Sequence, residues 1–359
     1  MSEVLADAGV NPRVRLVTTD GDERIVEAMP GQSVVEAAAA ASIILPSLCG
    51  KGTCGTCVGR LWSGEVHMRP FEDDALGPSA GEDAVLLCCA EPTGDLEVGL
   101  PFDSSKLVEQ APAERTVSVT DLTHLTPHIV RLQAQLEPDE LMGAAAEFEA
   151  GQYMQLQVPG TDVLRAYSMS NVSNWDGALE FLIHIRDQGL FSTWLDQQAS
   201  VGDQLRAVGP QGTFALVENG MRPRWFVGGG CGLAPLLSML RRMAEWGDPQ
   251  PTRLVLGVNT TNDVFALDEV RELADQLPEL TVTLAVWEGE VPDDEGQIRY
   301  VKGSSVDVLA HDLDAVDDPE QLPDIYVCGP PGMVKALEES VAERGIDPEL
   351  VHTERITQN

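Results

Sequence analysis

Four cysteines have the spacing of an iron–sulfur site. Cys49, Cys54 and Cys57 lie in one short segment, and Cys88 follows further along the chain. A C-x4-C-x2-C run with a distant fourth cysteine is the plant-type arrangement that holds a 2Fe-2S cluster, which carries single electrons. A zinc site would usually show paired C-x2-C knuckles, and a disulfide cluster is disfavoured in a chain without a secretory signal. The cysteines therefore predict a one-electron centre.

The segment between these cysteines contains three glycines, Gly50, Gly52 and Gly55. They allow backbone N–H groups to turn toward an anionic centre. The fourth ligand is either Cys88 or its neighbour Cys89. Because residues 85–87 read as a strand that delivers the next residue to the loop, we assign Cys88 as the ligand. Cys89 is then expected to point to the opposite side.

Two glycine-rich loops in the last third of the chain could hold phosphates. Residues 228–235 (GGGCGLAP) follow a strand-like run and open a helix, whose free N–H groups and partial positive charge favour an anion. Residues 328–333 (CGPPGM) follow another strand-like run. Loops at the carboxyl ends of parallel strands form the edge where nucleotides bind. A single loop of this kind can also serve close packing alone.

Residues 165–171 (RAYSMSN) alternate charged, aromatic and hydroxyl side chains. Arg165, Tyr167 and Ser170 could reach a phosphate, a flat ring and a polar ring edge, although an ordinary surface strand would show the same alternation. Residues 189–193 form a second turn that leads into a helix, which suits a pyrophosphate.

The composition of the chain limits the kinds of molecule that it is expected to bind. The formal net charge is −35, so the chain lacks the clustered Lys and Arg that nucleic-acid binding needs. An acidic surface suits a basic docking partner, or serves solubility alone. No apolar run approaches the ~20 residues of a membrane span, and the chain opens without a basic leader region. We therefore expect a cytoplasmic protein that does not bind membranes, monomeric as isolated.

The elements that must position these residues fall into three segments. Residues 1–103 begin with a hairpin of strands at 13–18 and 24–27, followed by a capping box, Ser33 with Glu36, that starts a helix ending before Pro46. Two strands, one helix and a cysteine loop predict a β-grasp ferredoxin domain. Residues 104–114, rich in Ser, Ala and Pro, read as a linker.

The other two segments differ from each other in their expected order of strands and helices. Residues 115–219 contain short alternating runs typical of an antiparallel β-barrel or sandwich, with a helix at 191–198. Residues 222–359 alternate apolar strands with helices, which predicts an α/β domain with a parallel sheet. The expected strands are 225–227, 254–258, 282–286 and 325–327, and the clearest helices are 235–246 and 333–344. The whole is a multidomain α+β chain.

Taken together, these motifs resemble the reductase component of soluble di-iron monooxygenases, in which a plant-type ferredoxin domain precedes a ferredoxin-NADP reductase-like module. The resemblance covers nearly the whole chain. It rests on the cluster cysteines and on six further motifs in one order: 85–88 before 95–97, 165–168, 189–192, 209–212, 228–235 and 328–333.

The resemblance implies three cofactors: a 2Fe-2S cluster, FAD and NADH. By this likeness the FAD site comprises Arg165, Tyr167, Ser168, Ser170, Gly189, Ser192 and Thr193. The nicotinamide nucleotide is framed by Gly229, Gly230, Cys231, Gly232, Pro235, Gly329, Pro330 and Gly332, with Cys328 as the catalytic residue near the hydride-donating carbon.

The chain departs from the family pattern at three places. Where the family commonly has L-I-R, this chain has L-I-H, so either His184 or Arg186 supplies the missing charge. Cys231 replaces the usual Thr or Ser of the glycine turn. The tail, residues 353–356, lacks the aromatic residue that shields the flavin in related proteins.

The three predicted sites form a route. NADH gives up two electrons as a hydride and the cluster accepts one, so the flavin, which holds one or two, must stand between them. Residues 259–263, expected near the adenosine ribose, contain no Arg or Lys, and Asp263 would repel a 2′-phosphate, which predicts NADH over NADPH.

The expected electron acceptor is the hydroxylase of a di-iron monooxygenase. The alternative is the oxygenase of a Rieske-type aromatic ring dioxygenase, whose reductase can share this domain order. A redox-sensing regulator is disfavoured because the chain offers no DNA-binding element or spare domain.

Overall fold

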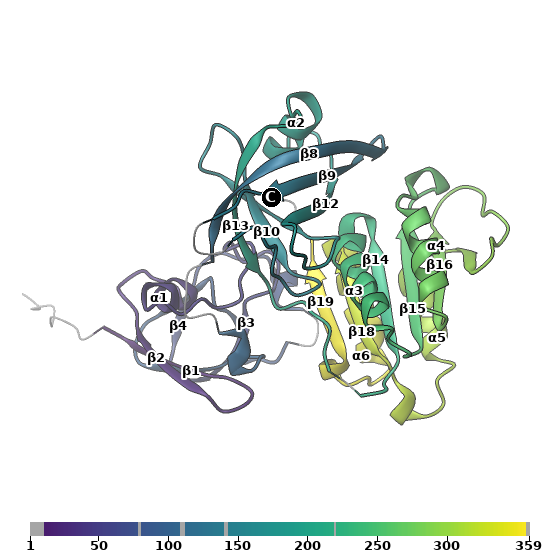
Figure 1. The fold of residues 1–359 in the computed structure, drawn as a ribbon. Helices are drawn as coiled ribbons and strands as arrows, with labels where there is room; N and C mark the ends of the chain where they lie inside the picture. The colour runs from purple at the N-terminus through teal and green to yellow at the C-terminus, as the bar shows by residue number, and fades with distance from the viewer. Residues whose placement is uncertain (1–10, 78–79, 108–111, 140–142, 219, 357–359) are drawn as a thin grey trace, which may run out of the picture. The chain divides into compact units, whose positions relative to one another are not determined.

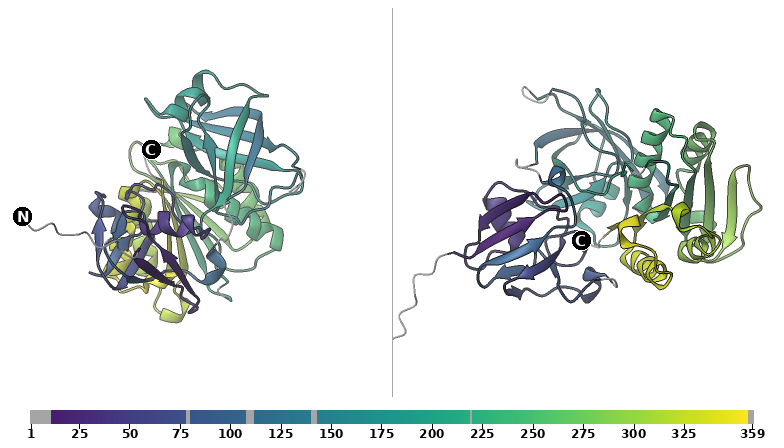
Figure 2. Two further views of the ribbon diagram at one scale, coloured as in Figure 1. Left: turned by 90° about the vertical axis from the view of Figure 1, so that its left-hand side faces the viewer. Right: turned by 90° about the horizontal axis from the view of Figure 1, so that it is seen from below.

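The computed structural model describes residues 11–77, 80–107, 112–139, 143–218 and 220–356. It falls into two compact units, Met1–Ala111 and Pro112–Asn359 (Figures 1 and 2). The boundary lies within the predicted linker 104–114, of which residues 108–111 are outside the described residues, as is residue 219 at the end of the predicted second segment. No helix among the described residues has the length and apolar character needed to cross a membrane.

The first unit is built on a five-stranded sheet in the order β2-β1-β7-β3-β5. Its elements are β1 (Arg13–Val17), β2 (Glu23–Glu27), α1 (Val34–Ala40), β3 (Val58–Ser63), β4 (Val66–Met68), β5 (Ala84–Leu86), β6 (Ala90–Pro92) and β7 (Leu96–Gly99), with short 3-10 turns at Asp73–Leu76 and Ser104–Lys106. β1 pairs with β2 antiparallel and with β7 parallel. This β-grasp arrangement confirms the predicted ferredoxin fold.

The helix of the first unit begins where the sequence predicts. The Ser33 hydroxyl accepts the N–H of Glu36 at 3.2 Å, and the Glu36 carboxylate accepts the N–H of Ser33 at 2.8 Å. This reciprocal pair satisfies two donors that the first helical turn would otherwise leave free. Val34, Ala37 and Ala38 are fully buried against the apolar face of the sheet, so α1 completes the core that supports the cysteine loop.

The second unit begins with a six-stranded antiparallel barrel. Its elements are β8 (Glu114–Thr126), β9 (Ile129–Leu136), β10 (Tyr153–Gln157), β11 (Leu164–Ser168), β12 (Ala178–His184), α2 (Leu190–Gln197) and β13 (Gln204–Gln211), and the strand order is β11-β10-β13-β8-β9-β12. Just past the end of β11, Met169 bridges to Phe181 and the N–H of Ser170 donates to the Glu180 carbonyl at 2.8 Å. These bonds join the two outer strands, so the predicted barrel is closed.

A six-stranded parallel sheet follows in the order β17-β16-β15-β14-β18-β19. Its strands are β14 (Arg224–Gly229), β15 (Thr252–Val258), β16 (Leu280–Val286), β17 (Ile298–Lys302), β18 (Asp324–Gly329) and β19 (Val351–Arg355). Its helices are α3 (Leu233–Trp246), α4 (Leu267–Gln276), α5 (Ser305–Leu313) and α6 (Pro331–Glu343), with 3-10 turns at Gly230–Gly232, Thr261–Asp263, Pro319–Gln321 and Pro348–Leu350. The parallel sheet confirms the predicted α/β domain, and β17 and β19 extend it beyond the four expected strands.

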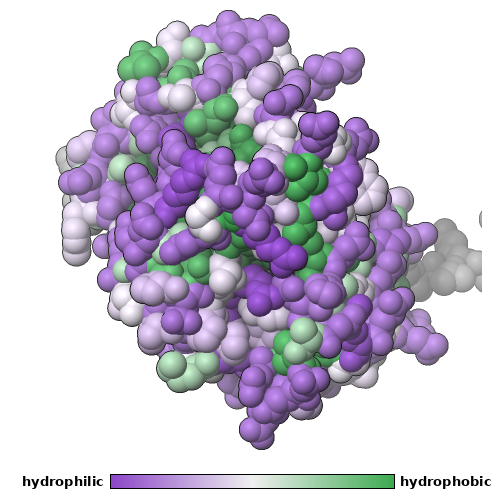
Figure 3. Space-filling model, turned by 90° about the vertical axis from the view of Figure 1, so that its right-hand side faces the viewer, coloured by the Kyte–Doolittle hydropathy of each residue, from purple (hydrophilic) through white to green (hydrophobic). Residues whose placement is uncertain are grey.

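The helices cover both faces of this sheet. Side chains of α3 and α4, such as Leu236 and Val270, share one core, whereas Leu309 of α5 and Leu337 of α6 belong to another. The first core also includes Leu182 of the barrel. The barrel and the parallel sheet are therefore packed together as one unit. Polar side chains dominate the face seen in Figure 3, as the large negative charge requires.

Candidate functional site

The cysteine loop owes its shape to glycine backbone conformations. Gly50, Gly52 and Gly55 all have positive φ angles, 62°, 70° and 78°. Other residues adopt this left-handed region only at a cost. The resulting turns direct the N–H groups of Lys51 and Thr53 to the Cys49 sulfur, each at 3.4 Å. The loop therefore presents donors to a thiolate, as the sequence predicted.

The four predicted ligand cysteines are brought together. Interaction with the side chains of Cys54 and Cys88 lowers the pKa of Cys49. The Cys88 thiol also contacts Cys57. Within the described part of the chain, no group of three or more His, Cys, Asp or Glu side chains is arranged around a single metal ion. Four linked sulfurs with inward N–H donors fit a 2Fe-2S cluster, which is larger than one ion.

Cys89 does not point away from this site. Its sulfur lies 3.7 Å from that of Cys88, so the expectation that it faces the opposite side is wrong. The strand β5 ends at Leu86, and both cysteines lie in the turn before β6, where strand alternation does not apply. A Cβ added to Gly52 would lie 2.7 Å from the Cys89 sulfur. Cys89 thus packs behind the loop, while Cys88 contacts the other ligand sulfurs.

The two glycine-rich loops lie side by side. β14 and β18 are neighbours with Gly228 opposite Cys328, and a Cβ on Gly232 would lie 2.0 Å from the Cys328 carbonyl oxygen. From β14 the sheet grows toward β17 on one side and toward β19 on the other. This reversal of strand order is the place where parallel α/β sheets bind nucleotides. The structure therefore places both predicted loops at that crevice.

The glycines of this edge have different surroundings. A Cβ added to Gly229 would lie 2.7 Å from the Met333 sulfur and 3.2 Å from Pro330, so this glycine packs closely on the second loop. Gly230 and Gly332 have nothing within 4 Å of an added Cβ, so they border open space. Pro235 is buried in the first turn of α3, where its missing N–H leaves no bond unmade. The open glycines lie where a nucleotide would approach the backbone.

The flavin motif lies on β11, opposite the helix α2. Arg165, Tyr167 and Ser168 are half-buried there, and the Tyr167 ring packs on Phe191 of α2 with ring centres 5.0 Å apart. Burial raises the pKa of Tyr167, with Arg165, Cys231 and Arg186 acting on it electrostatically. The glycine turn that holds Cys231 is therefore close to the flavin motif.

Two arginines lie near this motif. Arg165 donates to the Leu164 carbonyl, and within the part of the chain that the structure describes neither Arg165 nor Arg186 forms an ion pair with a carboxylate. In a chain of such negative charge, unpaired guanidinium groups at one site favour an anionic ligand. The donor set fits the diphosphate of FAD.

The turn before α2 is held by its own side chains. The Ser192 hydroxyl donates to the carbonyls of Arg186 and Gly189 at 3.1 and 3.2 Å, and the Thr193 N–H donates to the Gly189 carbonyl at 2.8 Å. Ser192 is buried, so it shapes the turn, whereas Thr193 is partly exposed at the helix start. Direct contact of either residue with the pyrophosphate stays a prediction.

Two further predicted residues have other surroundings. Ser170 is fully buried and its hydroxyl donates to Glu180 at 2.7 Å, so it faces the interior of the unit. His184 stacks on His128, and burial, Arg186 and His128 lower its pKa. The imidazole is therefore neutral near pH 7, which makes Arg186 the better candidate for the missing positive charge.

A buried glutamate completes the crevice, and the sequence analysis missed it. Glu354 lies on β19 opposite Cys328, and the Ser168 hydroxyl donates to it at 3.5 Å. Burial raises the pKa of Glu354 to about 8, so this carboxyl is protonated at neutral pH. Burial, Glu354 and Cys231 together raise the pKa of Cys328, which is fully buried as a neutral thiol. Residues 351–355 (VHTER) show no apolar–polar alternation, so the sequence carried no signal that placed Glu354 on a strand.

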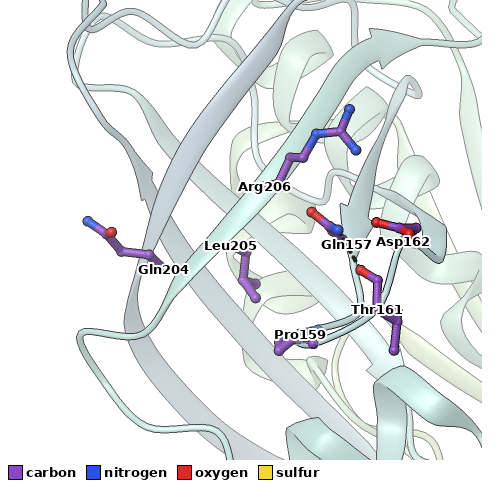
Figure 4. Close-up of a pocket in the computed structure, with 8 residues that line it drawn as sticks. Gln157, Pro159, Thr161, Asp162, Gln204, Leu205 and Arg206 are labelled. Carbon is purple, nitrogen blue, oxygen red and sulfur yellow. Dashed lines mark hydrogen bonds between the residues drawn. The ribbon is translucent and has the colours of Figure 1, made fainter.

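A separate cavity of about 450 Å³ lies on the barrel (Figure 4). It lies between β13 and the turn after β10, and Arg206 at its rim pairs with Glu114. Its lining includes no predicted site residue.

Comparisons with known proteins agree with this geometry. Family models match residues 17–93 as a 2Fe-2S iron-sulfur cluster binding domain, residues 116–216 as an oxidoreductase FAD-binding domain and residues 226–339 as an oxidoreductase NAD-binding domain. The reductase component of propane 2-monooxygenase from Rhodococcus jostii is 32% identical over 90% of this chain and 86% of its own length. The chain belongs to the family of oxygenase reductase components.

Members of this family serve different oxygenases. The electron transfer component of toluate 1,2-dioxygenase from Pseudomonas putida is 31% identical over 94% of this chain and 96% of its own length. The crystal structure of an Amycolatopsis cytochrome P450 reductase matches with a TM-score of 0.71 and 28% identity, covering 96% of this chain and 99% of that one. The protein is an NADH-dependent iron–sulfur flavoprotein oxidoreductase. When bound, FAD converts two-electron hydride transfer into the single-electron steps that a 2Fe-2S cluster can take.

Proposed function

We propose that this reductase passes electrons from NADH, through FAD and the 2Fe-2S cluster, to the hydroxylase of a soluble di-iron monooxygenase in the cytoplasm. The observation that supports this electron route is that one chain contains two kinds of redox site. A nucleotide crevice beside a flavin motif lies in one unit, and four converging cysteines lie in the other. The ordered motifs and the propane 2-monooxygenase relative support the choice of acceptor.

The proposal assigns the cluster, the flavin and the nucleotide to different groups of residues. Cys49, Cys54, Cys57 and Cys88 hold the cluster. Arg165 and Arg186 pair with the FAD diphosphate, and the Tyr167 ring lies against the flavin. The open edge at Gly230 and Gly332 admits the nicotinamide nucleotide next to Cys328. The protonated Glu354 provides a neutral hydrogen-bond donor beside Ser168, so no negative charge meets the incoming hydride.

The preference for NADH has a structural basis at the ends of β15 and β16. The Asp263 carboxylate accepts hydrogen bonds from the N–H and the hydroxyl of Thr260, both at 2.8 Å. These bonds hold the carboxylate in place at this edge of the sheet. The N–H of Glu288 donates to the Asn259 carbonyl at 2.7 Å, which brings a second acidic residue alongside. Two carboxylates would repel a 2′-phosphate. Equal flavin reduction rates with NADH and NADPH at low, matched concentrations would contradict this assignment.

A Rieske-type dioxygenase remains the second candidate acceptor, because the toluate dioxygenase component matches along nearly all of both chains. Reconstitution distinguishes the two. The purified holoprotein, shown by iron, sulfide and flavin analysis to carry both centres, is mixed with NADH and either a di-iron hydroxylase or a Rieske oxygenase. We expect product only with the di-iron hydroxylase. Product only with the Rieske oxygenase would replace the proposed acceptor.

A further inference from the structure

A carboxylate is buried where the barrel meets the parallel sheet. Glu180 lies on β12, and its side chain is 12% exposed. One of its oxygens accepts hydrogen bonds from the Ser170 hydroxyl at 2.7 Å and from the Arg241 guanidinium at 2.8 Å, and the other accepts the Gln133 amide at 3.0 Å. Burial alone would raise the pKa of Glu180, but the charge and hydrogen bond of Arg241 outweigh it and lower the pKa. Glu180 is therefore ionised.

The same arginine binds the segment that follows the flavin motif. The Arg241 group that contacts Glu180 also donates to the Ser170 carbonyl at 2.8 Å. Ser170 comes two residues after the end of β11, which carries the flavin motif, and Arg241 lies on α3, which begins at the glycine turn of the nucleotide crevice. Glu180 and Arg241 thus join the two elements between which a hydride must pass.

A second bond reinforces this connection one helical turn earlier. The hydroxyl of Ser238, which is fully buried on α3, donates to the Asn171 carbonyl at 2.6 Å. The Asn171 side-chain oxygen in turn accepts the N–H of Glu180 at 2.9 Å. The backbone of residues 170–171 is consequently held by α3 at two points along the helix.

The network extends to a second helix of the sheet. Arg131 of β9 lies 3.7 Å from the second oxygen of Glu180 and also pairs with Glu269 of α4. The side chains of Arg131 and Glu180 are 19% and 12% exposed, so this ion pair is largely buried. Glu180 therefore connects the barrel to both helices on one face of the sheet.

An apolar interface would not define the same geometry. Buried ion pairs contribute little to stability compared with apolar packing, but removing one partner is costly because it strands a buried charge. Leu182 of the barrel and Leu236 of α3 belong to one apolar core, and apolar contacts, which are non-directional, tolerate small sliding movements. Hydrogen bonds of 2.6 to 2.8 Å at residues 170, 171 and 180 do not.

We propose that Ser170, Glu180 and Arg241 form a positioning cluster that sets the distance between the flavin strand and the glycine turn. The cluster thereby fixes how closely the nicotinamide approaches the flavin. None of the three residues touches the reacting atoms. The inference rests on the proposed electron route from NADH to FAD, and it assigns Ser170 to this cluster.

The test uses the holoprotein with Glu180→Gln, which keeps the shape of the side chain and removes its charge. Flavin reduction by NADH is followed by stopped flow at saturating NADH, with both ordinary NADH and NADH deuterated at the transferred position. We expect a ten- to hundredfold slower reduction, because displacement by about 1 Å at a reacting centre has this effect. FAD content and the NADH dissociation constant should change by less than about threefold, and the isotope effect should change.

The same helix offers a matched control. Arg242 pairs with Glu245 at 2.9 Å on the exposed side of α3, so Glu245→Gln removes an ion pair without touching the barrel. Its flavin reduction rate should stay within twofold of the wild type. Arg241→Lys keeps the charge but loses the length and fixed planar geometry of the guanidinium, so its rate should fall between those of the wild type and Glu180→Gln.

The outcomes separate the two proposals. A wild-type protein whose FAD is not reduced by NADH would reject the electron route itself. A wild type that is reduced normally, with Glu180→Gln and Arg241→Lys at the same rate per bound FAD, would overturn only the positioning cluster. A lowered melting temperature with an unchanged rate and isotope effect would overturn it as well, since that is the signature of a purely structural role. If Glu180→Gln loses its FAD, the Arg241→Lys rate decides.

Discussion

The cysteine loop and the nucleotide crevice both depend on glycine, but for different physical reasons. Gly50, Gly52 and Gly55 are needed for their positive φ angles, and an added Cβ at Gly50 would meet nothing within 4 Å. Gly232 has an ordinary helical backbone with φ of −61°, yet a Cβ there would lie 2.0 Å from a carbonyl oxygen. Gly50 is therefore needed for its conformation alone, whereas Gly232 is needed for the close approach of two backbones.

The two regions also treat carboxylates in opposite ways. In the first unit, hydrogen bonds from Arg69 and from the Ser33 backbone lower the pKa of Glu36 to about 2. In the second unit, burial raises the pKa of Glu354 to about 8. The ferredoxin unit keeps a paired, ionised carboxylate near its surface, and the nucleotide crevice keeps a neutral one in its interior. Hydrogen bonding therefore keeps Glu36 charged, whereas burial keeps Glu354 neutral.

The variant with the largest expected effect tests whether Cys88, rather than Cys89, is the fourth ligand of the cluster at the cysteine loop. Cys88→Ser should lose most of its bound iron and its visible cluster absorbance, because Cys88 contacts Cys49 and Cys57. Cys89→Ser should keep both, since Cys89 packs behind Gly52. Iron and sulfide content and the EPR spectrum of the reduced protein are the measurements. A cluster kept by Cys88→Ser and lost by Cys89→Ser would reverse the assignment.

The second prediction tests whether Gly232 is required because two backbones approach closely there. Gly232→Ala should lower the free energy of unfolding of the second unit by about 3 kcal/mol, because the new methyl group collides with the backbone of Cys328. Gly332→Ala is the matched control on the same edge, with nothing within 4 Å of the added Cβ, and should change stability by less than about 0.5 kcal/mol. Denaturant unfolding followed by circular dichroism and FAD release measures both. Equal stability of the two variants would show that close approach is not the constraint.

The sequence predicted the local features of both regions. The capping box at Ser33, the strand–turn–helix at 228–235 and the cysteine loop are each defined within about ten residues, where spacing and backbone preference decide the structure. Cys89 was misplaced because strand alternation was extended to a residue three positions beyond Leu86, where β5 ends. The error shows that a strand pattern does not hold in the turn that follows the strand.

The features that the sequence could not provide are contacts between distant segments. Glu354 becomes part of the crevice only because β19 pairs with β18 in a register that sets it opposite Cys328. Glu180 meets Arg241 across the contact between barrel and sheet. Neither pairing leaves a periodic signal, since each residue reads as an ordinary charged position in its own segment.

The third prediction uses the opposite pKa shifts. Glu354 binds a proton in the folded protein up to about pH 8 but only to about pH 4.5 when unfolded. The free energy of unfolding should therefore decrease as pH rises between these values, by at most about 1.4 kcal/mol per pH unit. Glu354→Gln should remove this slope. Glu36 acts in the other direction, because its contribution is present above about pH 4.5 and is lost as pH falls toward 2.

Urea unfolding of the holoprotein from pH 5 to 8.5 measures the slope for the second unit through FAD release. Glu36→Gln serves as the control, since its titration lies below this range and should leave the slope unchanged. Parallel curves for the wild type and Glu354→Gln would mean that Glu354 is ionised in the folded protein, and the crevice would then hold a negative charge.

The smallest expected effect tests the conformational side of the comparison. At Gly50 an alanine meets no neighbour, so its cost is only that of the left-handed backbone, about 1 kcal/mol. Asparagine tolerates this conformation better, so Gly50→Asn should retain the cluster better than Gly50→Ala even though its side chain is larger. At Gly232 the order should reverse, because there the size of the side chain decides. The rate of cluster loss in mild denaturant, followed by visible absorbance, compares the Gly50 variants, and a greater loss with asparagine would indicate that space rather than backbone conformation limits this loop.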